Sequence, residues 1–250
     1  KASSMATKFW PIKPTKSQIN FLMRLLPLLV LGAGFLTFFC LGLDRYLSFH
    51  ALKENKELLS QWRDEYYFMS VILFVGTYGA LSAFSVPISV WMTLVGGFMF
   101  GTLAGGVSSL LGATFGAMVI FFVARYTLAD VLRKKCGEAI VSMEAGFKEN
   151  QLSYMLVLRL VPLFPFWLVN LVPAFLNVST RTYLTGTLFG MIPGALVYAS
   201  VGNGLSTVFE SGTEPDIGVI FSPNILIPIL GLAVLAFIPV FYKKLKHRIN

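Results

Sequence analysis

The sequence predicts an all-α polytopic membrane protein with interfacial amphipathic helices, built as an inverted repeat of two re-entrant hairpins, each followed by a transmembrane helix. Of its 250 residues 56% are hydrophobic and only 13% charged, and the mean hydropathy is +0.73, which is typical of chains that cross lipid. The run 159–173 is too apolar for a water-facing loop, yet it contains Pro162, Pro165 and Pro173, each of which removes a backbone donor. Broken backbone at membrane depth persists only where protein buries it or where it lines a wet cavity. We therefore expect this run to enter the membrane and return to the same side.

The net charge of +8 would favour a nucleic-acid partner in a soluble domain. Here the basic residues cluster at the ends of apolar runs, which indicates contact with lipid headgroups, so we expect membrane lipids as partners and no nucleic acid. Cys40 and Cys136 form neither a disulfide framework nor a metal site, and His50 and His247 lie outside the apolar runs. The sequence predicts no metal and no cofactor, and it leaves room for a homo-oligomer.

The first part of the chain leads from a basic segment into the membrane. Residues 1–24 are polar and basic, which predicts a cytoplasmic N-terminal segment, and residues 25–43 are long and apolar enough for a first transmembrane helix. Residues 46–67 mix charged and apolar residues at helical spacing. This pattern predicts an amphipathic helix on the membrane surface, with a solvated connector as the alternative.

The last part of the chain repeats these kinds of segment. Residues 128–150 carry an apolar stripe at three- and four-residue spacing, which predicts a second amphipathic helix. Residues 202–223 contain acidic and no basic side chains and are predicted as a loop, and residues 225–242 as the last transmembrane helix. The unit 205–250 thus combines an acidic loop, a span and a basic tail.

Two pieces of the chain resemble each other. Gly112-Ala-Thr-Phe-Gly116 matches Gly186-Thr-Leu-Phe-Gly190, and Val95-Gly-Gly-Phe98 matches Val172-Pro-Ala-Phe175 at nearly the same offset. Small residues at this spacing let a neighbouring helix approach closely. Each unit is therefore predicted to be a broken hairpin followed by a span rich in small residues, with chance similarity of glycine-rich sequence as the alternative.

The predicted hairpins cover about residues 68–101 and 152–177. For the first of them, one span followed by a short loop is an alternative. Prolines and glycines give both hairpins and the following span their shape. These residues are Pro87, Gly96, Gly97, Pro162, Pro165, Pro173, Gly190, Pro193 and Gly194.

The distribution of basic residues predicts the orientation of these units. The N-terminus, the segment 125–148 and the C-terminus are basic, whereas the loop 202–223 is acidic. All basic parts face the cytoplasm if the first hairpin enters from outside and the second from inside. The two units then have inverted topology, which is a device of transporters.

Five motifs occur together in this part of the chain. They are Gly96-Gly-Phe-Met-Phe-Gly101, Gly112-Ala-Thr-Phe-Gly116, Ala124-Arg-Tyr126, Arg159-Leu-Val-Pro-Leu-Phe-Pro165 with Asn170, and Gly190-Met-Ile-Pro-Gly194. Over about residues 49–204 the chain resembles the DedA superfamily, also called the SNARE-associated Golgi protein or VTT-domain family. The resemblance implies a membrane domain, here over 46–204, with two re-entrant hairpins that face each other. In several members it implies lipid scrambling or translocation of a lipid carrier. Members of the lipid-carrier type have an acidic residue near the first hairpin, and its absence from residues 83–90 argues against proton coupling.

Arg159 is the strongest candidate for a functional residue. A charge inside an apolar run is costly and is commonly functional or paired. Arg159 can hold an anionic phosphate headgroup, or it can instead reach the membrane surface or bind freed backbone carbonyls. The other candidate substrate-binding residues are Asn170, which can also satisfy hairpin backbone, and Arg125, which can also anchor the end of its span.

The function predicted from these features is transport. Because the long apolar runs contain no Asp, Glu or His, and an active site needs such groups at one place, we expect no enzyme and no catalytic residues. The leading hypothesis is a transporter or scramblase that moves phospholipid-like amphipathic molecules through a cavity between the hairpins. A non-transporting scaffold that binds partners or shapes lipid is one alternative, and a transporter of small molecules or metal ions is another. We expect an integral protein of a bacterial inner (plasma) membrane, with a eukaryotic endomembrane or organelle as the alternative.

Overall fold

The computed structural model describes residues 16–127, 150–161 and 166–210, together with isolated residues between 147 and 235. These segments are helical, and none of them contains a strand. The prediction of an all-α protein is confirmed for this part of the chain. The predicted amphipathic helix over 128–150 and the predicted last span over 225–242 lie, apart from isolated residues, outside the described residues.

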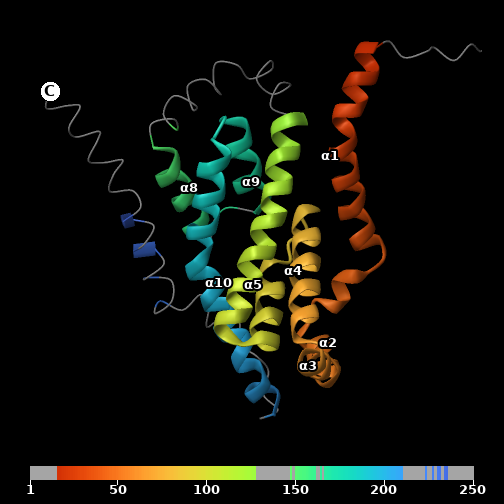
Figure 1. The fold of residues 1–250 in the computed structure, drawn as a ribbon, viewed down its shortest axis with the longest axis vertical. Coiled ribbons are helices and arrows are strands. Elements are labelled where there is room, and N and C mark those ends of the chain that lie inside the picture. Colours follow the sequence, from red (N-terminus) through yellow and green to blue (C-terminus); the bar gives the residue numbers. More distant parts are fainter. Residues whose placement is uncertain are drawn as a thin grey trace, which may run out of the picture.

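Two long helices lie at the centre of the fold, with shorter helices around them (Figure 1). In chain order the elements are α1 (Lys16–Cys40), the 3₁₀ helix η1 (Leu43–Tyr46), α2 (Phe49–Glu54), α3 (Lys56–Glu65), α4 (Tyr67–Ala83), α5 (Ser89–Thr127), α8 (Gln151–Leu160), α9 (Phe166–Phe175) and α10 (Thr180–Glu210). Among the described residues, two helices, Ser89–Thr127 and Thr180–Leu205, are long and apolar enough to cross a membrane, and the sharply bent pair of α3 and α4 can count as a third span. The chain therefore has the helices of a polytopic membrane protein.

Helix α4 and the first part of α5 form an antiparallel pair. Near the start of α4 the ring of Tyr67 contacts the ring of Phe100. Toward the end of α4 the hydroxyl of Tyr78 donates to the carbonyl of Ser89 over 2.9 Å. Figure 1 shows α4 ending about halfway along the bundle and the first part of α5 returning to the end where α4 began. The turn between them contains Pro87, as the sequence predicts.

The chain reverses a second time inside α5. Gly101 has φ 78°, which is the left-handed region that glycine enters without a steric penalty. A Cβ atom on Gly105 would collide with the backbone of Gly96, so the two parts of α5 lie against each other on either side of Gly101. The long second part of α5 then runs through the whole bundle (Figure 1).

Helices α8 and α9 form a second pair beside α10. A Cβ atom on Gly186 would meet the side chain of Met155, and one on Gly190 would meet Arg159, so α8 runs alongside the first half of α10. Figure 1 shows the joined ends of α8 and α9 near the middle of the bundle. Pro173 lies inside α9, whereas the predicted hairpin residues Pro162 and Pro165 lie outside the described residues.

The two halves meet through small residues on α5 and α10. A Cβ atom on Gly97 would collide with the backbone of Ala199, and one on Gly202 would collide with the backbone of Leu94. In a membrane the hydrophobic effect does not drive helices together, and helices associate through close backbone contact of this kind. Pro193 and Gly194 lie inside α10, which continues past them to Glu210. No atom lies within 4 Å of a Cβ added to Gly194.

Two predicted helices, over 25–43 and 46–67, had the wrong bounds. The first helix runs over Lys16–Cys40 rather than 25–43, because Gly42 turns the chain with φ 63° before η1 begins. The single amphipathic helix predicted over 46–67 is divided into η1, α2 and α3, since Asn55 has non-helical backbone angles between α2 and α3.

The loop predicted from residue 202 was also wrong at its start. Helix α10 continues to Glu210, so the first part of the predicted acidic segment is helical. Leu205 and Phe209 in this part are buried against Leu52 of α2. Burial of these apolar side chains favours the longer helix over an exposed loop.

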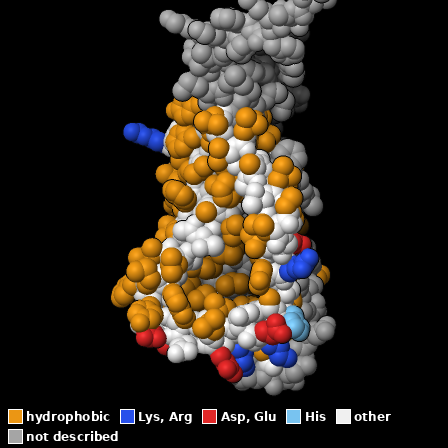
Figure 2. All heavy atoms as spheres, turned by 90° about the vertical axis from the view of Figure 1, so that its right-hand side faces the viewer, with side chains coloured by type: hydrophobic (Ala, Val, Ile, Leu, Met, Phe, Trp, Pro, Cys, Tyr) orange, Lys and Arg blue, Asp and Glu red, His pale blue; other side chains and the backbone are white. Residues whose placement is uncertain are grey.

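The short helices α2 and α3 carry many of the charged side chains of the described chain, at one end of the molecule. Figure 2 shows acidic and basic groups at this lower end, below a broad hydrophobic face. Arg63 of α3 donates from Nη1 to the carbonyl of Met99 over 3.2 Å, which ties α3 to the end of the first helical pair. The hydrogen bond from Arg63 Nε also lowers the pKa of Asp64 below its usual value.

The close contact between α5 and α10 predicts that even the substitution of Gly97 by alanine lowers the stability of the protein. In Gly97→Ala the new methyl group must displace backbone, so we expect a loss of at least about 1–3 kcal/mol in the free energy of unfolding. Gly76→Ala on α4 is the matched control because no atom lies within 4 Å of a Cβ added there. Thermal unfolding in detergent measures both, and equal midpoints would contradict the close contact.

Candidate functional site

The most polar buried site of the described chain surrounds Arg159. This residue lies in the last turn of α8 and is partly buried, whereas the side chains that surround it, Asn170, Tyr183 and Thr187, are 0% exposed. The three come from α9 and α10. The cluster therefore lies where the second helical pair joins the long helix α10.

One nitrogen of Arg159 makes three of the hydrogen bonds in this cluster. Its Nη2 atom donates to Oδ1 of Asn170 at 2.7 Å, to the hydroxyl of Tyr183 at 3.0 Å and to the hydroxyl of Thr187 at 3.0 Å. The guanidinium carbon also lies 5.5 Å from the centre of the Tyr183 ring, a cation–π arrangement. The dipoles of one amide and two hydroxyl groups, together with the face of an aromatic ring, thus surround the positive charge of Arg159.

No carboxylate neutralises Arg159 among the residues that the structure describes. The salt bridges in this part of the chain, His50 with Glu54 and Arg63 with Asp64, lie on the surface helices. A charge held at membrane depth without a counter-ion is costly. The site thus keeps a net positive charge in a mostly apolar environment.

Two donors of the site have no partner within the described chain. Nε of Arg159 and Nδ2 of Asn170 are both buried and make no hydrogen bond there. A guanidinium has no acceptor, so the amide oxygen of Asn170 must face it and leaves the amide nitrogen free. An unpaired buried donor costs about 1–3 kcal/mol. Unpaired donors beside a positive charge are a binding arrangement for an oxyanion.

An aromatic stack supports the site from the side of α5. The rings of Phe121 and Tyr183 are stacked, with their centres 4.1 Å apart and an angle of 16° between their planes. The hydroxyl of Tyr183 also lies 2.8 Å from Oδ1 of Asn170 and 3.1 Å from the carbonyl of Ala117. These contacts of the ring and the hydroxyl hold Tyr183 in place. They therefore fix the position of the hydroxyl that accepts a hydrogen bond from Arg159.

Arg125 lies on the other side of this stack and holds a turn. Its guanidinium carbon is 5.5 Å from the centre of the Phe121 ring. Nη1 donates to the carbonyl of Val178 at 2.8 Å, and Nη2 donates to Oδ1 of Asn177 at 3.0 Å. Asn177 has a left-handed φ of 54°. Arg125 thus connects the end of α5 to the turn between α9 and α10.

The structure brings together two of the three predicted site residues. Arg159 and Asn170 are in direct contact, whereas Arg125 binds a turn, as its anchoring alternative predicts. Sequence reasoning did not select Tyr183, Thr187 or Phe121. Tyr183 and Thr187 lie four residues apart and so share one face of α10, which is the signal that the sequence offered for them.

The first helical pair approaches the same part of α5. A Cβ atom on Gly116 would meet Ser82 of α4, and the carbonyl of the next residue, Ala117, is the one that Tyr183 contacts. The end of α4 and Tyr183 of α10 therefore meet consecutive residues of α5. These features define a helical membrane protein with a partly buried arginine at the junction of α8, α9 and α10, which no carboxylate of the described residues neutralises.

Residues 86–204 match the family model of the VTT domain. The matched range includes all of α5, α8 and α9, and α10 as far as residue 204, and so it contains the whole Arg159 site. This part of the chain is therefore similar to the VTT domain, and the predicted resemblance to the DedA superfamily is confirmed.

Curated relatives agree with this family. The chain is 28% identical to transmembrane protein 41 homolog of Dictyostelium discoideum over 81% of its own length and 60% of the relative. It is 27% identical to transmembrane protein 41B of Gallus gallus over 77% of its length and 71% of the relative. For the Homo sapiens protein of that name these values are 27%, 77% and 65%.

The match thus spans about two thirds of the length of these relatives. No solved structure matches the chain significantly. Family and apolar helices together show an integral membrane protein. The choice between a bacterial inner membrane and a eukaryotic endomembrane stays a prediction.

The position of Tyr183 predicts the cost of losing its hydroxyl. In Tyr183→Phe the ring still stacks on Phe121, but Arg159 and Asn170 each lose a partner, so we expect about 1–3 kcal/mol less stability. Tyr198→Phe, on the same helix, is the control because the described chain offers its hydroxyl no hydrogen bond. Thermal unfolding in detergent compares them. An equal, small change in both variants would exclude the hydroxyl as a support of the site.

Proposed function

We propose that the protein moves phospholipid-like amphipathic molecules across the bilayer, as a transporter or scramblase. Arg159 and Asn170 hold the anionic phosphate of the headgroup during passage. One observation carries this proposal: the unpaired donors Nε of Arg159 and Nδ2 of Asn170 lie beside a cation that has only neutral partners. A phosphate supplies both a negative charge and several acceptors, and a guanidinium can offer it two parallel donors.

The site supports binding and release rather than covalent chemistry. It offers N–H donors, hydroxyls and a permanent positive charge, and none of these gains or loses a proton readily near neutral pH. Its apolar surroundings suit the tails of an amphipathic molecule. We therefore propose a transporter that is not an enzyme, in line with the lipid scrambling that the family resemblance implies.

The path that we propose depends on inverted re-entrant hairpins. In the first unit Gly116 of α5 faces Ser82 near the end of α4, and in the second Gly190 of α10 faces Arg159 near the end of α8. Figure 1 shows the two pairs entering the bundle from opposite ends, with their tips near its middle. Both features support an inverted repeat in which Ser82 takes the place that Arg159 has in the other unit.

Buried hydroxyls add polar groups beyond the arginine. Ser82, Ser109 and Thr114 are buried, and their hydroxyl oxygens make no hydrogen bond within the described chain. Ser109 and Thr114 belong to α5, the helix that both hairpins contact. We propose that these groups belong to the polar path that a headgroup follows between the two hairpins.

Substitution of Arg159 tests the proposed function. In liposomes that contain a fluorescent phospholipid in both leaflets, we expect Arg159→Lys to lose most of the translocation rate and Arg159→Ala at least tenfold. A lysine supplies only a point charge in place of the planar pair of donors. Arg181→Ala, an exposed arginine on the same helix bundle, is the matched control and should keep its activity.

Thermal stability, measured in parallel, separates function from folding. Full activity of folded Arg159→Ala would overturn the role of the arginine. Absence of translocation by the unsubstituted protein, with lipid sidedness unchanged, would favour the scaffold alternative.

Single cysteines in a cysteine-free background test the topology. If the first hairpin is re-entrant, Tyr66→Cys and Leu103→Cys become labelled from the same side, which we expect to be the outside. Tyr126→Cys and Ser179→Cys, at the opposite end, become labelled from the cytoplasmic side. All four side chains are exposed, and a membrane-impermeant maleimide measures their accessibility. Labelling of Tyr66→Cys and Leu103→Cys from opposite sides would exclude a re-entrant first hairpin.

A further inference from the structure

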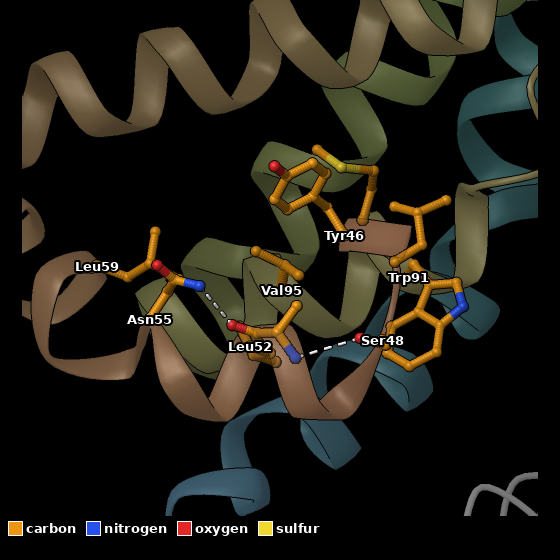
Figure 3. A pocket seen from close by; sticks show the side chains of 10 residues that line it. Tyr46, Ser48, Leu52, Asn55, Leu59, Trp91 and Val95 are labelled. Atoms are coloured by element: carbon orange, nitrogen blue, oxygen red, sulfur yellow. Dashed lines mark hydrogen bonds between the residues drawn. The ribbon is translucent and has the colours of Figure 1, made fainter. Parts of the chain in front are cut away.

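A cavity lies between the surface helices and the start of α5, and none of its lining residues belongs to the Arg159 site. Its volume is about 250 Å³. Figure 3 shows Leu52, Leu59, Val95 and Trp91 around it, with Tyr46 above them. Side chains from η1, α2, α3 and α5 thus form one common wall that is almost entirely apolar.

Ser48 and Asn55, two polar side chains in this wall, are already bound to backbone. Nδ2 of Asn55 donates to the carbonyl of Ala51 at 2.8 Å. The hydroxyl of Ser48 donates to the carbonyl of Arg45 at 3.2 Å and accepts from the amide of Ala51 at 3.2 Å. Tyr46 and Trp91 add a hydroxyl and an indole N–H to a mostly apolar lining, which is less than the several convergent polar groups that a polar ligand needs. Apolar cavities of about 150 Å³ exclude water and bind apolar molecules, so the ligand that fits this larger cavity is a hydrocarbon.

The surroundings of the cavity identify the source of that hydrocarbon. Leu41 before η1, Leu43 at the start of η1, and Leu58 and Trp62 on α3 are exposed. In an integral membrane protein such exposed apolar side chains contact lipid. Trp and Tyr side chains concentrate at the level of the headgroups, and helices with one charged and one apolar face lie in that layer. The cavity is therefore placed where acyl chains begin.

The charges on η1, α2 and α3 beside the cavity nearly balance each other. The acidic residues are Asp44, Glu54, Glu57, Asp64 and Glu65, and the basic residues are Arg45, Lys53, Lys56 and Arg63. An excess of one sign would favour a headgroup of the opposite sign, whereas this balance suits a headgroup that carries both. We propose that the cavity holds one acyl chain of a zwitterionic bilayer phospholipid, with its headgroup over α2.

A bound chain in this position joins the surface helices to the first hairpin. It fills the space between Leu52 and Leu59 on one side and Trp91 and Val95 on the other. Since this lipid stays in place, the proposal does not depend on the movement of lipid past Arg159.

Trp91 reports on the occupant directly. In a variant whose other tryptophans are replaced by Phe, reconstituted into phosphatidylcholine vesicles with brominated acyl chains, we expect strong quenching of Trp91 fluorescence. Ala51→Phe places a ring in the cavity and should reduce this quenching at least twofold. Leu59→Phe fills it less and should have a smaller effect in the same direction. Leu58→Phe changes an exposed neighbour and should leave the quenching unchanged.

The controls define what would overturn the proposal. Equal quenching in the folded Ala51→Phe and Leu58→Phe variants would assign the signal to bulk lipid. Ready quenching of Trp91 by water-soluble acrylamide, in the protein without a change at Ala51, would show a wet cavity. Equal quenching by brominated phosphatidylglycerol would remove the preference for a zwitterionic headgroup. Unaltered melting temperatures show that the variants are folded.

Discussion

The guanidinium of Arg159 is the constraint around which the second half of the fold is arranged. A charge at membrane depth needs hydrogen-bond partners, and here they come from α9 and α10 rather than from a carboxylate. Because the acceptors are neutral, the positive charge remains available to a ligand. A carboxylate in the same place would have neutralised the charge and removed its attraction for a phosphate. The same contacts that hold the hairpin against α10 therefore keep the site able to bind an anion.

The support of this arginine depends on α5 as well as on its own hairpin. Phe121 stacks on Tyr183, and the carbonyl of Ala117 lies beside the tyrosine hydroxyl. Arg125, one turn beyond Phe121, binds the turn that leads into α10. These contacts make α5 a common support for both halves of the molecule. Arg125 thus binds the turn between α9 and α10, the two helices whose side chains surround Arg159.

The two long helices, α5 and α10, pack closely because glycines lie at their contact. Gly97 and Gly202 each lie against backbone of the opposite helix. The sequence predicted close approach at the glycines of 112–116 and 186–190, which lie against α4 and α8. The end of α10 depends instead on a contact between distant parts of the chain. Helix α10 extends to Glu210 because Leu205 and Phe209 are buried against Leu52. No local pattern shows that contact, since Leu52 lies about 150 residues earlier in the chain.

The sequence by itself determined that the chain is helical and lies in a membrane, and it singled out Arg159 and Asn170, because apolar length and a charge within an apolar run are local properties. It also placed the break before α10 among prolines, whose missing donors act on their own turn. The tertiary structure alone decided that Tyr183 and Thr187 surround Arg159 and that Arg125 binds the turn before α10. A hydrogen bond depends on the distance between two groups in space. That distance was set only when α8, α9 and α10 packed together on α5.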